Sequence, residues 1–150
     1  MPDVTGLTVT ADYGDFDGVE AALALPTLID LVRFVYEAEG APLTAQVGFA
    51  FVNEAEIIDL HERYLGDATR TDILTFPDAP DNASGEIAIC VPVAADNAIE
   101  LETSTVREAA FLVVHGLLHL LGWNDESDQS RSAMLTRQDA LLDQWGGTSR

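Results

Sequence analysis

Four segments of the chain have the pattern of apolar and polar positions that is typical of β-strands. Residues 7–13 and 46–52 alternate between apolar and polar side chains. A period of two places successive side chains on opposite faces of a sheet, so both segments predict half-buried strands. Residues 72–76 and 86–91 are shorter apolar runs next to turn-forming residues, and we expect strands there as well.

Other segments repeat their apolar residues every three to four positions, as on one face of a helix. Two pairs, Asn53 with Glu56 and Thr105 with Glu108, have the spacing of a capping box. Gly66 is expected to end the helix that Asn53 begins. Together these signals predict five helices. Four of them are expected at residues 26–39, 53–64, 95–100 and 129–145. The fifth begins at residue 105 and carries both histidines of the long apolar run.

Turn-forming residues separate these elements. The acidic segment 12–18 predicts a solvated loop, and residues 77–84 and 123–128 predict two further loops. No repeat or linker divides the sequence, so we expect a single domain over residues 1–150, with residues 146–150 frayed. Strands and helices in this order predict an α+β fold, a small four-stranded sheet packed by about five helices.

The charge balance narrows the functional classes. Twenty-six Asp and Glu residues face seven basic residues, all arginine, for a net charge of −19. A field of this sign repels polyanions and, taken alone, argues against a nucleic-acid binder. It does not exclude a nuclease, because a metal and a few arginines can form a local positive cleft within a screening length of about 10 Å.

Cysteine content and hydropathy bear on the compartment. Cys90 is the one cysteine, so no internal disulfide can form, and a reducing cytoplasm is expected. The first residues do not resemble a signal peptide. The apolar run 109–123 is too short to span a membrane and carries two histidines, so we expect a buried helix and no membrane contact.

The most specific chemical signal is the spacing of His115, His119, Gly122 and Asp125. On a helix, a step of four residues places both imidazoles on one face, one turn apart. Glycine readily adopts the left-handed conformation that ends a helix, so Asp125 can turn back toward the two rings. Two imidazole nitrogens and one carboxylate oxygen, with a fourth position open, form a catalytic zinc arrangement. The sequence therefore predicts a zincin-like metal helix with His115, His119 and Asp125 as ligands.

Zinc peptidases use the same frame in the motif H-E-x-x-H-x-x-G-x-x-H, where the glutamate is the general base. In this chain the position after the first histidine is Gly116. The glutamate that accepts a proton in zinc peptidases is therefore missing here, which argues against proteolysis. A peptidase would need another carboxylate, Glu108 or Asp72, to reach the water on the metal.

Three ordered blocks resemble the YbeY family of bacterial endoribonucleases. The segment HGLLHLLGWND at residues 115–125 resembles the signature H-G-x-L-H-L-x-G-[YW]-D-H. YLG at 64–66 with TDILTFP at 71–77 resembles Y-R-G…T-[DN]-V-L-S-F-P, and GEIAI at 85–89 resembles G-D-I-x-I. Their order and spacing agree, and the similarity covers nearly the whole chain.

The resemblance implies a fold, a cofactor and an activity. It implies an α+β fold with a mixed sheet, and zinc held by the residues that match the family ligands, His115, His119 and Asp125. It also implies a cytoplasmic, metal-dependent endoribonuclease that acts on single-stranded RNA. The expected substrate is precursor ribosomal RNA, in 3′-end maturation and ribosome quality control.

Two positions depart from the family pattern. Asp125 stands where the family has a third histidine. A carboxylate is an acceptable zinc ligand, and its charge shifts the preference toward harder ions such as Mn²⁺. Leu65 stands where the family has an arginine, and the neighbouring Arg63 and Arg70 are candidates to contact a substrate phosphate in its place. For each of them, a solvent-facing or ion-paired surface role is the alternative.

Two other functions stay open at this point. The altered ligand, the missing arginine and the acidity also fit a binding factor that kept the fold and lost the reaction, with a structural zinc. Such a factor would dock on a ribosomal protein or a ribosome-associated GTPase, since a negative surface suits basic partners. A metallopeptidase is the weaker alternative.

Overall fold

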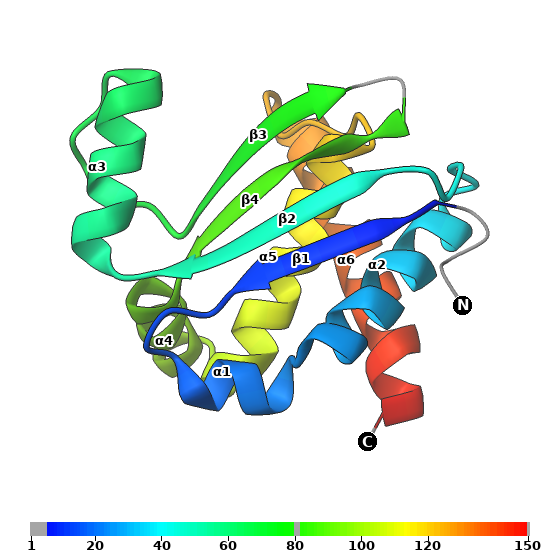
Figure 1. Ribbon diagram of the computed structural model, residues 1–150, viewed down its shortest axis with the longest axis horizontal. Helices are drawn as coiled ribbons and strands as arrows, with labels where there is room; N and C mark the ends of the chain where they lie inside the picture. The colour runs from blue at the N-terminus through cyan, green and yellow to red at the C-terminus, as the bar shows by residue number, and fades with distance from the viewer. Residues whose placement is uncertain (1–5, 80–81, 150) are drawn as a thin grey trace.

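The computed structural model describes the backbone of residues 6–79 and 82–149, whose arrangement is shown in Figure 1. The strands are β1 (Thr8–Asp12), β2 (Gln46–Val52), β3 (Ile73–Ala79) and β4 (Ser84–Cys90). The helices are α1 (Asp17–Ala22), α2 (Leu25–Ala38), α3 (Glu54–Leu65), α4 (Val91–Glu100), α5 (Thr105–Leu120) and α6 (Asp128–Ser149). The predicted α+β fold is confirmed, with six helices in the described residues.

The four strands form one mixed sheet in the order β1-β2-β4-β3. β1, β2 and β4 run parallel, whereas β3 is antiparallel to β4 and forms one edge. Parallel neighbours require a crossover connection. Between β1 and β2 the chain crosses over through α1 and α2, and between β2 and β4 it crosses over through α3 and β3.

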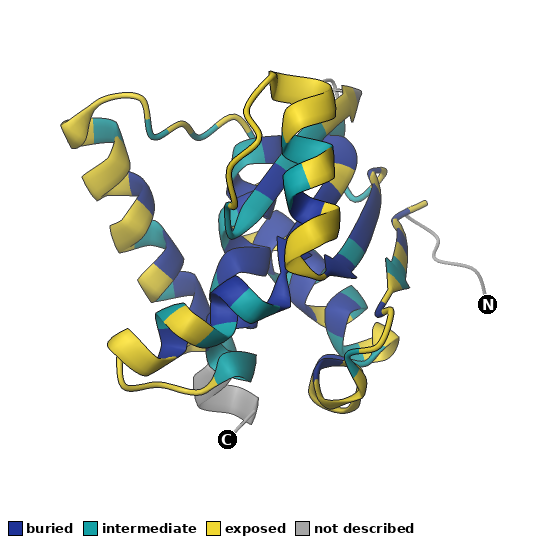
Figure 2. Ribbon diagram, turned by 90° about the vertical axis from the view of Figure 1, so that its left-hand side faces the viewer, coloured by how far each residue is buried: buried dark blue, intermediate teal, exposed yellow. Residues whose placement is uncertain are grey.

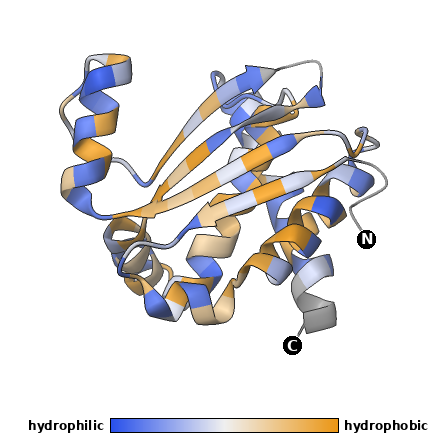
Figure 3. Ribbon diagram, viewed as in Figure 1, coloured by the Kyte–Doolittle hydropathy of each residue, from blue (hydrophilic) through white to orange (hydrophobic). Residues whose placement is uncertain are grey.

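Alternation along the strands divides the core between the two faces of the sheet (Figure 3). On one face, Phe49 and Phe51 of β2 and Ile87 and Ile89 of β4 pack with α2 and α5 in the main core. On the other face, a smaller cluster packs beneath α3, and its buried members are Val52, Ile57, Leu74, Ala88, Cys90 and Val93. Figure 2 shows the buried residues gathered where the central helix meets the sheet. No helix among the described residues is long and apolar enough to cross a membrane.

The capping signals agree with the structure at α3 and differ at α5. The Asn53 side chain accepts from the Glu56 amide at 2.9 Å and the Glu56 carboxylate accepts from the Asn53 amide at 3.0 Å, and Gly66 ends the helix at φ 70°. At α5 the cap is Ser104, whose hydroxyl accepts from the Arg107 amide at 3.0 Å. The expected capping role of Glu108 is therefore wrong, and this side chain is buried instead.

Several boundaries differ from the predictions because tertiary contacts extend the local elements. The segment 12–18, expected as a solvated loop, contains a buried Tyr13 that stacks on Phe51 with ring centroids 5.2 Å apart, and α1 begins at Asp17. β3 continues beyond residue 76 because it pairs with β4 through a register shift. α4 starts at Val91 because Pro92 fits the first turn of a helix.

The last helix is longer than the predicted 129–145, since α6 spans Asp128–Ser149. Arg150 lies outside the described residues, as do the side chains of residues 146–149. The predicted fraying of residues 146–150 therefore stays a prediction.

Gly116 allows α5 to approach the sheet closely. A β-carbon at this position would lie 2.9 Å from Cδ1 and 3.0 Å from Cγ2 of Ile87, and 3.2 Å from Cδ1 of Ile73. These distances are shorter than normal van der Waals contact between carbon atoms. Packing therefore favours glycine at position 116, because the glutamate that a zinc peptidase carries there would have to displace both isoleucine side chains.

We expect Gly116→Ala to lower the free energy of unfolding by about 1–2 kcal/mol, because overpacking outweighs the gain in helix propensity. Urea denaturation measures the change. Gly18→Ala is the matched control, since Gly18 lies in α1 with open space around its Cα, and it should raise stability by up to about 1 kcal/mol. An equal gain in the free energy of unfolding for both variants would contradict the prediction, because it would mean that Ile87 and Ile73 can shift without destabilising the protein.

Candidate metal centre

α5 presents His115 and His119 from one face. The two residues are one turn apart, and their rings meet edge to face with centroids 4.5 Å apart. Their Nε2 atoms lie only 3.0 Å from each other. Both side chains are partly exposed, so the pair lies at the surface of the core and not inside it.

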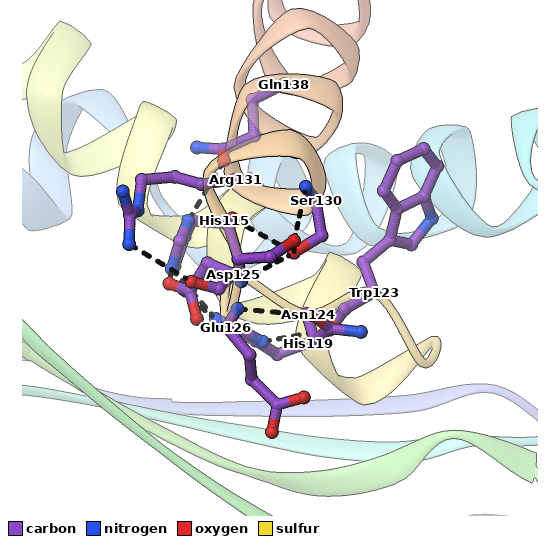
Figure 4. Close-up of polar contacts among 10 residues, drawn as sticks. His115, His119, Trp123, Asn124, Asp125, Glu126, Ser130, Arg131 and Gln138 are labelled. Carbon is purple, nitrogen blue, oxygen red and sulfur yellow. Dashed lines mark hydrogen bonds and ion pairs between the residues drawn. The ribbon is translucent and has the colours of Figure 1, made fainter.

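The turn after α5 brings in the third residue. Gly122 adopts φ 102°, a left-handed conformation that reverses the chain after the helix. The Asn124 side chain accepts from the Glu126 amide at 3.2 Å and tightens the following loop. As a result, Oδ2 of Asp125 lies 3.7 Å from Nε2 of His119 and 3.9 Å from Nε2 of His115 (Figure 4).

The three side chains meet the spacing that a tetrahedral cation requires. Bonds of about 2.1 Å at a tetrahedral angle place two ligand atoms about 3.4 Å apart. The three separations, 3.0, 3.7 and 3.9 Å, bracket that value. The cluster of His115, His119 and Asp125 can therefore hold a metal ion, with its ligand atoms all within 4.8 Å of one another.

Hydrogen bonds fix the direction of both rings. Nδ1 of His119 donates to the main-chain carbonyl of Trp123 at 3.0 Å, and Nδ1 of His115 donates to Oε1 of Gln138 at 2.9 Å. Because these oxygens accept, each Nδ1 carries the proton and each Nε2 presents a bare lone pair. Two bare lone pairs 3.0 Å apart repel each other, and a cation between them removes that repulsion.

Burial favours the uncharged form of His119. It lowers the pKa of His119 below its ordinary 6.5, and the neighbouring His115 lowers it further, against the Trp123 carbonyl and Asp125, which raise it. The neutral ring is the form that binds a metal. His119 is therefore favoured in the form that can bind a cation.

Two buried contacts support the ligands from behind. Gln138 of α6 is 0% exposed, and among the described residues its Nε2 has no hydrogen-bond partner. Trp123 donates from Nε1 to Oε1 of Glu39 at 2.8 Å, and Arg137 donates to the other oxygen of Glu39 at 2.6 Å. This clamp joins the end of α2 to the loop whose carbonyl orients His119.

A cleft of about 440 Å³ opens over His115, His119 and Asp125. Its opposite wall comes from the end of α3 and from β3 with the residues before it. The residues that line it are Leu65, Thr71, Asp72, Ile73, Leu74, Thr75, Pro77, His115, His119 and Asp125. Leu65, at the position where the family pattern has an arginine, therefore faces the same cleft as the ligands.

The two arginines predicted to contact phosphate are engaged elsewhere in this structure. Arg70 is paired with Glu54 at 3.2 Å and with Asp96 at 2.6 Å, and Arg63 is paired with Asp59. Neither is among the residues that line the cleft. Their contact with a phosphate stays a prediction.

A partly buried polar cluster of Asp72, Asn97 and Glu108 lies next to the cleft wall. Asn97 donates from Nδ2 toward Asp72 at 3.3 Å and toward Glu108 at 3.5 Å. Glu108 is only 6% exposed. Burial raises its pKa above the ordinary 4.5, the Asn97 amide opposes the shift, and the carboxylate of Asp72 adds to it.

Sequence reasoning missed Gln138, although a signal was present. Gln138 lies four residues after Met134 and three before Leu141, at a position of the apolar stripe of α6. A polar residue inside such a stripe needs a buried partner. That partner could not be identified, because His115 lies 23 positions away in the sequence.

The fold and site together define a class, a small α+β domain with a surface cleft over a His–His–Asp cluster that can hold a metal. The sequence model described as Endoribonuclease YbeY matches residues 19–146. The chain is 31% identical over 156 residues to the Endoribonuclease YbeY of Geobacillus thermodenitrificans, covering 95% of this chain and 99% of the relative. It is 37% identical over 131 residues to that of Moorella thermoacetica, covering 79% and 84%.

The chain therefore belongs to the YbeY endoribonuclease family, and the family resemblance predicted from the three sequence blocks is confirmed. A solution structure from Thermotoga maritima shares the fold, with a TM-score of 0.69 and 25% identity over 96% of this chain and 91% of that chain. Family membership supports an endoribonuclease role, a hydrolase acting on RNA.

We expect Gln138→Met to weaken zinc binding by about 10- to 100-fold, because His115 would lose the acceptor that fixes its ring. Gln138→Glu should bind zinc at least as tightly as the wild type, since a carboxylate is a stronger acceptor for Nδ1–H. Competition with a chromophoric chelator measures both affinities. Gln144→Met, at an exposed position of the same helix, is the matched control. Unchanged affinity in Gln138→Met would remove Gln138 from the metal centre.

We expect Glu108→Gln to raise the melting temperature near neutral pH, with the difference shrinking as the pH falls toward 4.5. The native state holds the Glu108 proton at pH values where the unfolded state releases it, so the wild type loses stability as the pH rises through the raised pKa. Glutamine needs no proton. Thermal melts across this range test the expectation, with the exposed Glu62→Gln as the control for loss of one charge. A constant difference at all pH values would contradict it.

Proposed function

We propose that the protein is a metal-dependent endoribonuclease that cuts single-stranded RNA at the cleft over His115, His119 and Asp125. The observation that carries the proposal is the 3.0 Å approach of the two Nε2 atoms beside the carboxylate of Asp125. This arrangement is unfavourable without a cation. The surface cleft above it has room for part of a nucleotide strand.

The ligand set favours zinc, with manganese as a second candidate. Two imidazoles and one carboxylate are a known catalytic zinc set. The charge of Asp125 also suits harder divalent ions. A divalent cation bound here supplies Lewis acidity to a phosphoryl oxygen and acidifies water. The chain's own residues orient the site: Gln138 and the Trp123 carbonyl accept from the Nδ1 atoms, so both Nε2 atoms point toward each other and toward Asp125, where the cation would bind.

Family membership supports a proposal for the substrate and the cellular setting. We propose precursor ribosomal RNA as the substrate, in 3′-end maturation and ribosome quality control in the cytoplasm. The net charge of −19 suits docking on a basic ribosomal protein or on a ribosome-associated GTPase, which would bring the RNA to the cleft despite the long-range repulsion. For Arg63 or Arg70 to contact phosphate, the guanidinium would first have to leave its carboxylate partners.

The two rival functions have different support. A metallopeptidase lacks the glutamate beside His115, and Gly116 is in contact distance of the sheet, where a larger side chain would have to displace both isoleucine side chains. A binding factor without catalysis would share the fold and the metal cluster. RNA cleavage by pure protein separates it from the enzyme.

We expect His115→Ala to lower the rate of cleavage of a single-stranded RNA by at least about 100-fold in zinc or manganese, because one of three metal ligands is lost. His61→Ala, which removes a histidine of α3, should cut at close to the wild-type rate. Metal content is measured on the same preparations. Equal cleavage by His115→Ala and wild type would sink the proposal, and bound metal without any cleavage would favour the binding factor.

A further inference from the structure

The cleft over the metal ligands lacks positive charge of its own. The residues that line it include the carboxylates of Asp72 and Asp125 and, among the described residues, no arginine. A divalent cation on the ligands would offset these two carboxylates and leave no excess charge for a phosphodiester. Binding an RNA phosphate beside the metal therefore calls for another cation close to the ligands.

Arg131 does not itself line the cleft, but it holds a guanidinium against the loop that carries Asp125. It lies in the first turn of α6, and its Nη2 donates to the main-chain carbonyl of Asp125 over a long 3.5 Å. Its Nη1 donates to Asp128 at 3.0 Å. Figure 4 shows Arg131 reaching from the helix toward Asp125, whose carboxylate points to both histidines. The positive charge of Arg131 thus lies against the backbone of Asp125, one of the three proposed metal ligands.

The present contacts of Arg131 are weak enough to be exchanged for a phosphate. Its side chain is 53% exposed and that of its partner Asp128 is fully exposed, so solvent screens the pair. A guanidinium has five N–H donors, and these two contacts leave others for a bidentate phosphate contact.

Other arginines are held more firmly or lie elsewhere. Arg70 has two carboxylate partners, and Arg137 is fixed by Glu39, whose side chain is only 13% exposed. Arg107, in the first turn of α5, pairs with Asp143 near the far end of α6. Arg131 is the one of these whose guanidinium donates to the loop carrying a metal ligand.

We propose that Arg131 binds a phosphate of the RNA strand next to the metal, and so determines the affinity of the cleft for single-stranded nucleic acid. The inference rests on the proposed function, in which RNA is the substrate.

The test measures binding of a fluorescein-labelled single-stranded DNA oligonucleotide to the zinc-loaded protein, by anisotropy between roughly 50 and 200 mM salt. DNA is used because it supplies the phosphates but lacks the 2′-hydroxyl, so the measurement reports phosphate binding alone. For Arg131→Ala we expect about tenfold weaker binding at low salt. The slope of log affinity against log salt should become shallower by about 0.7, the value for one phosphate contact to a single strand. Arg131→Lys should keep the wild-type slope.

Arg107→Ala is the matched control, because it removes the same charge at the other end of α5. Zinc content is measured for every variant. Equal affinities and slopes for Arg131→Ala and Arg107→Ala would overturn the proposal, as would loss of zinc in Arg131→Ala, which would make Arg131 a support for Asp125. Cleavage of RNA by the same wild-type preparation is assayed separately. Binding with the expected slope change but no cleavage would refute the enzyme and leave the phosphate contact standing. No binding of the DNA by the wild type would refute the phosphate contact, and the enzyme would then be judged by RNA cleavage alone.

Discussion

The close approach of α5 to the sheet at Gly116 sets the position of every functional side chain. With Ile87 and Ile73 only about one methyl group away, the helix can neither slide nor rotate without loss of packing. That fixed orientation turns His115 and His119 toward the β3 edge and the start of α6. The cleft exists because the turn at Gly122 then leaves space between the ligands and β3. The same close packing of α5 on the sheet therefore determines both the core and the geometry of the site.

The rings are aimed by acceptors that come from distant parts of the chain. The Trp123 carbonyl is held by the clamp to Glu39 at the end of α2, and Gln138 reaches His115 from the buried side of α6. Each contact costs the protein the burial of a polar group, which is favourable only when the group is paired. Within the described part of the chain, Oε1 of Gln138 orients His115, whereas Nε2 of the same amide has no hydrogen-bond partner.

Charge is arranged on two length scales. The net charge of −19 acts at long range and opposes a polyanionic substrate, whereas a metal and a guanidinium beside Asp125 act over a few ångströms, where screening is weak. Such a protein gains little from electrostatic steering. Its encounter with RNA depends on local contacts, or on a basic partner that delivers the strand.

The sequence by itself determined the strands, most helices, the mixed α+β class and the family, because these depend on periodicity and on short-range spacing. It also predicted the cluster of His115, His119 and Asp125, since all three lie within eleven residues and one glycine turn. Only the tertiary structure decided the cap at Ser104, the burial of Glu108, the role of Gln138 and the place of Arg131. These depend on which surfaces meet across the fold, and residues far apart in the chain carry no local pattern that records their contact.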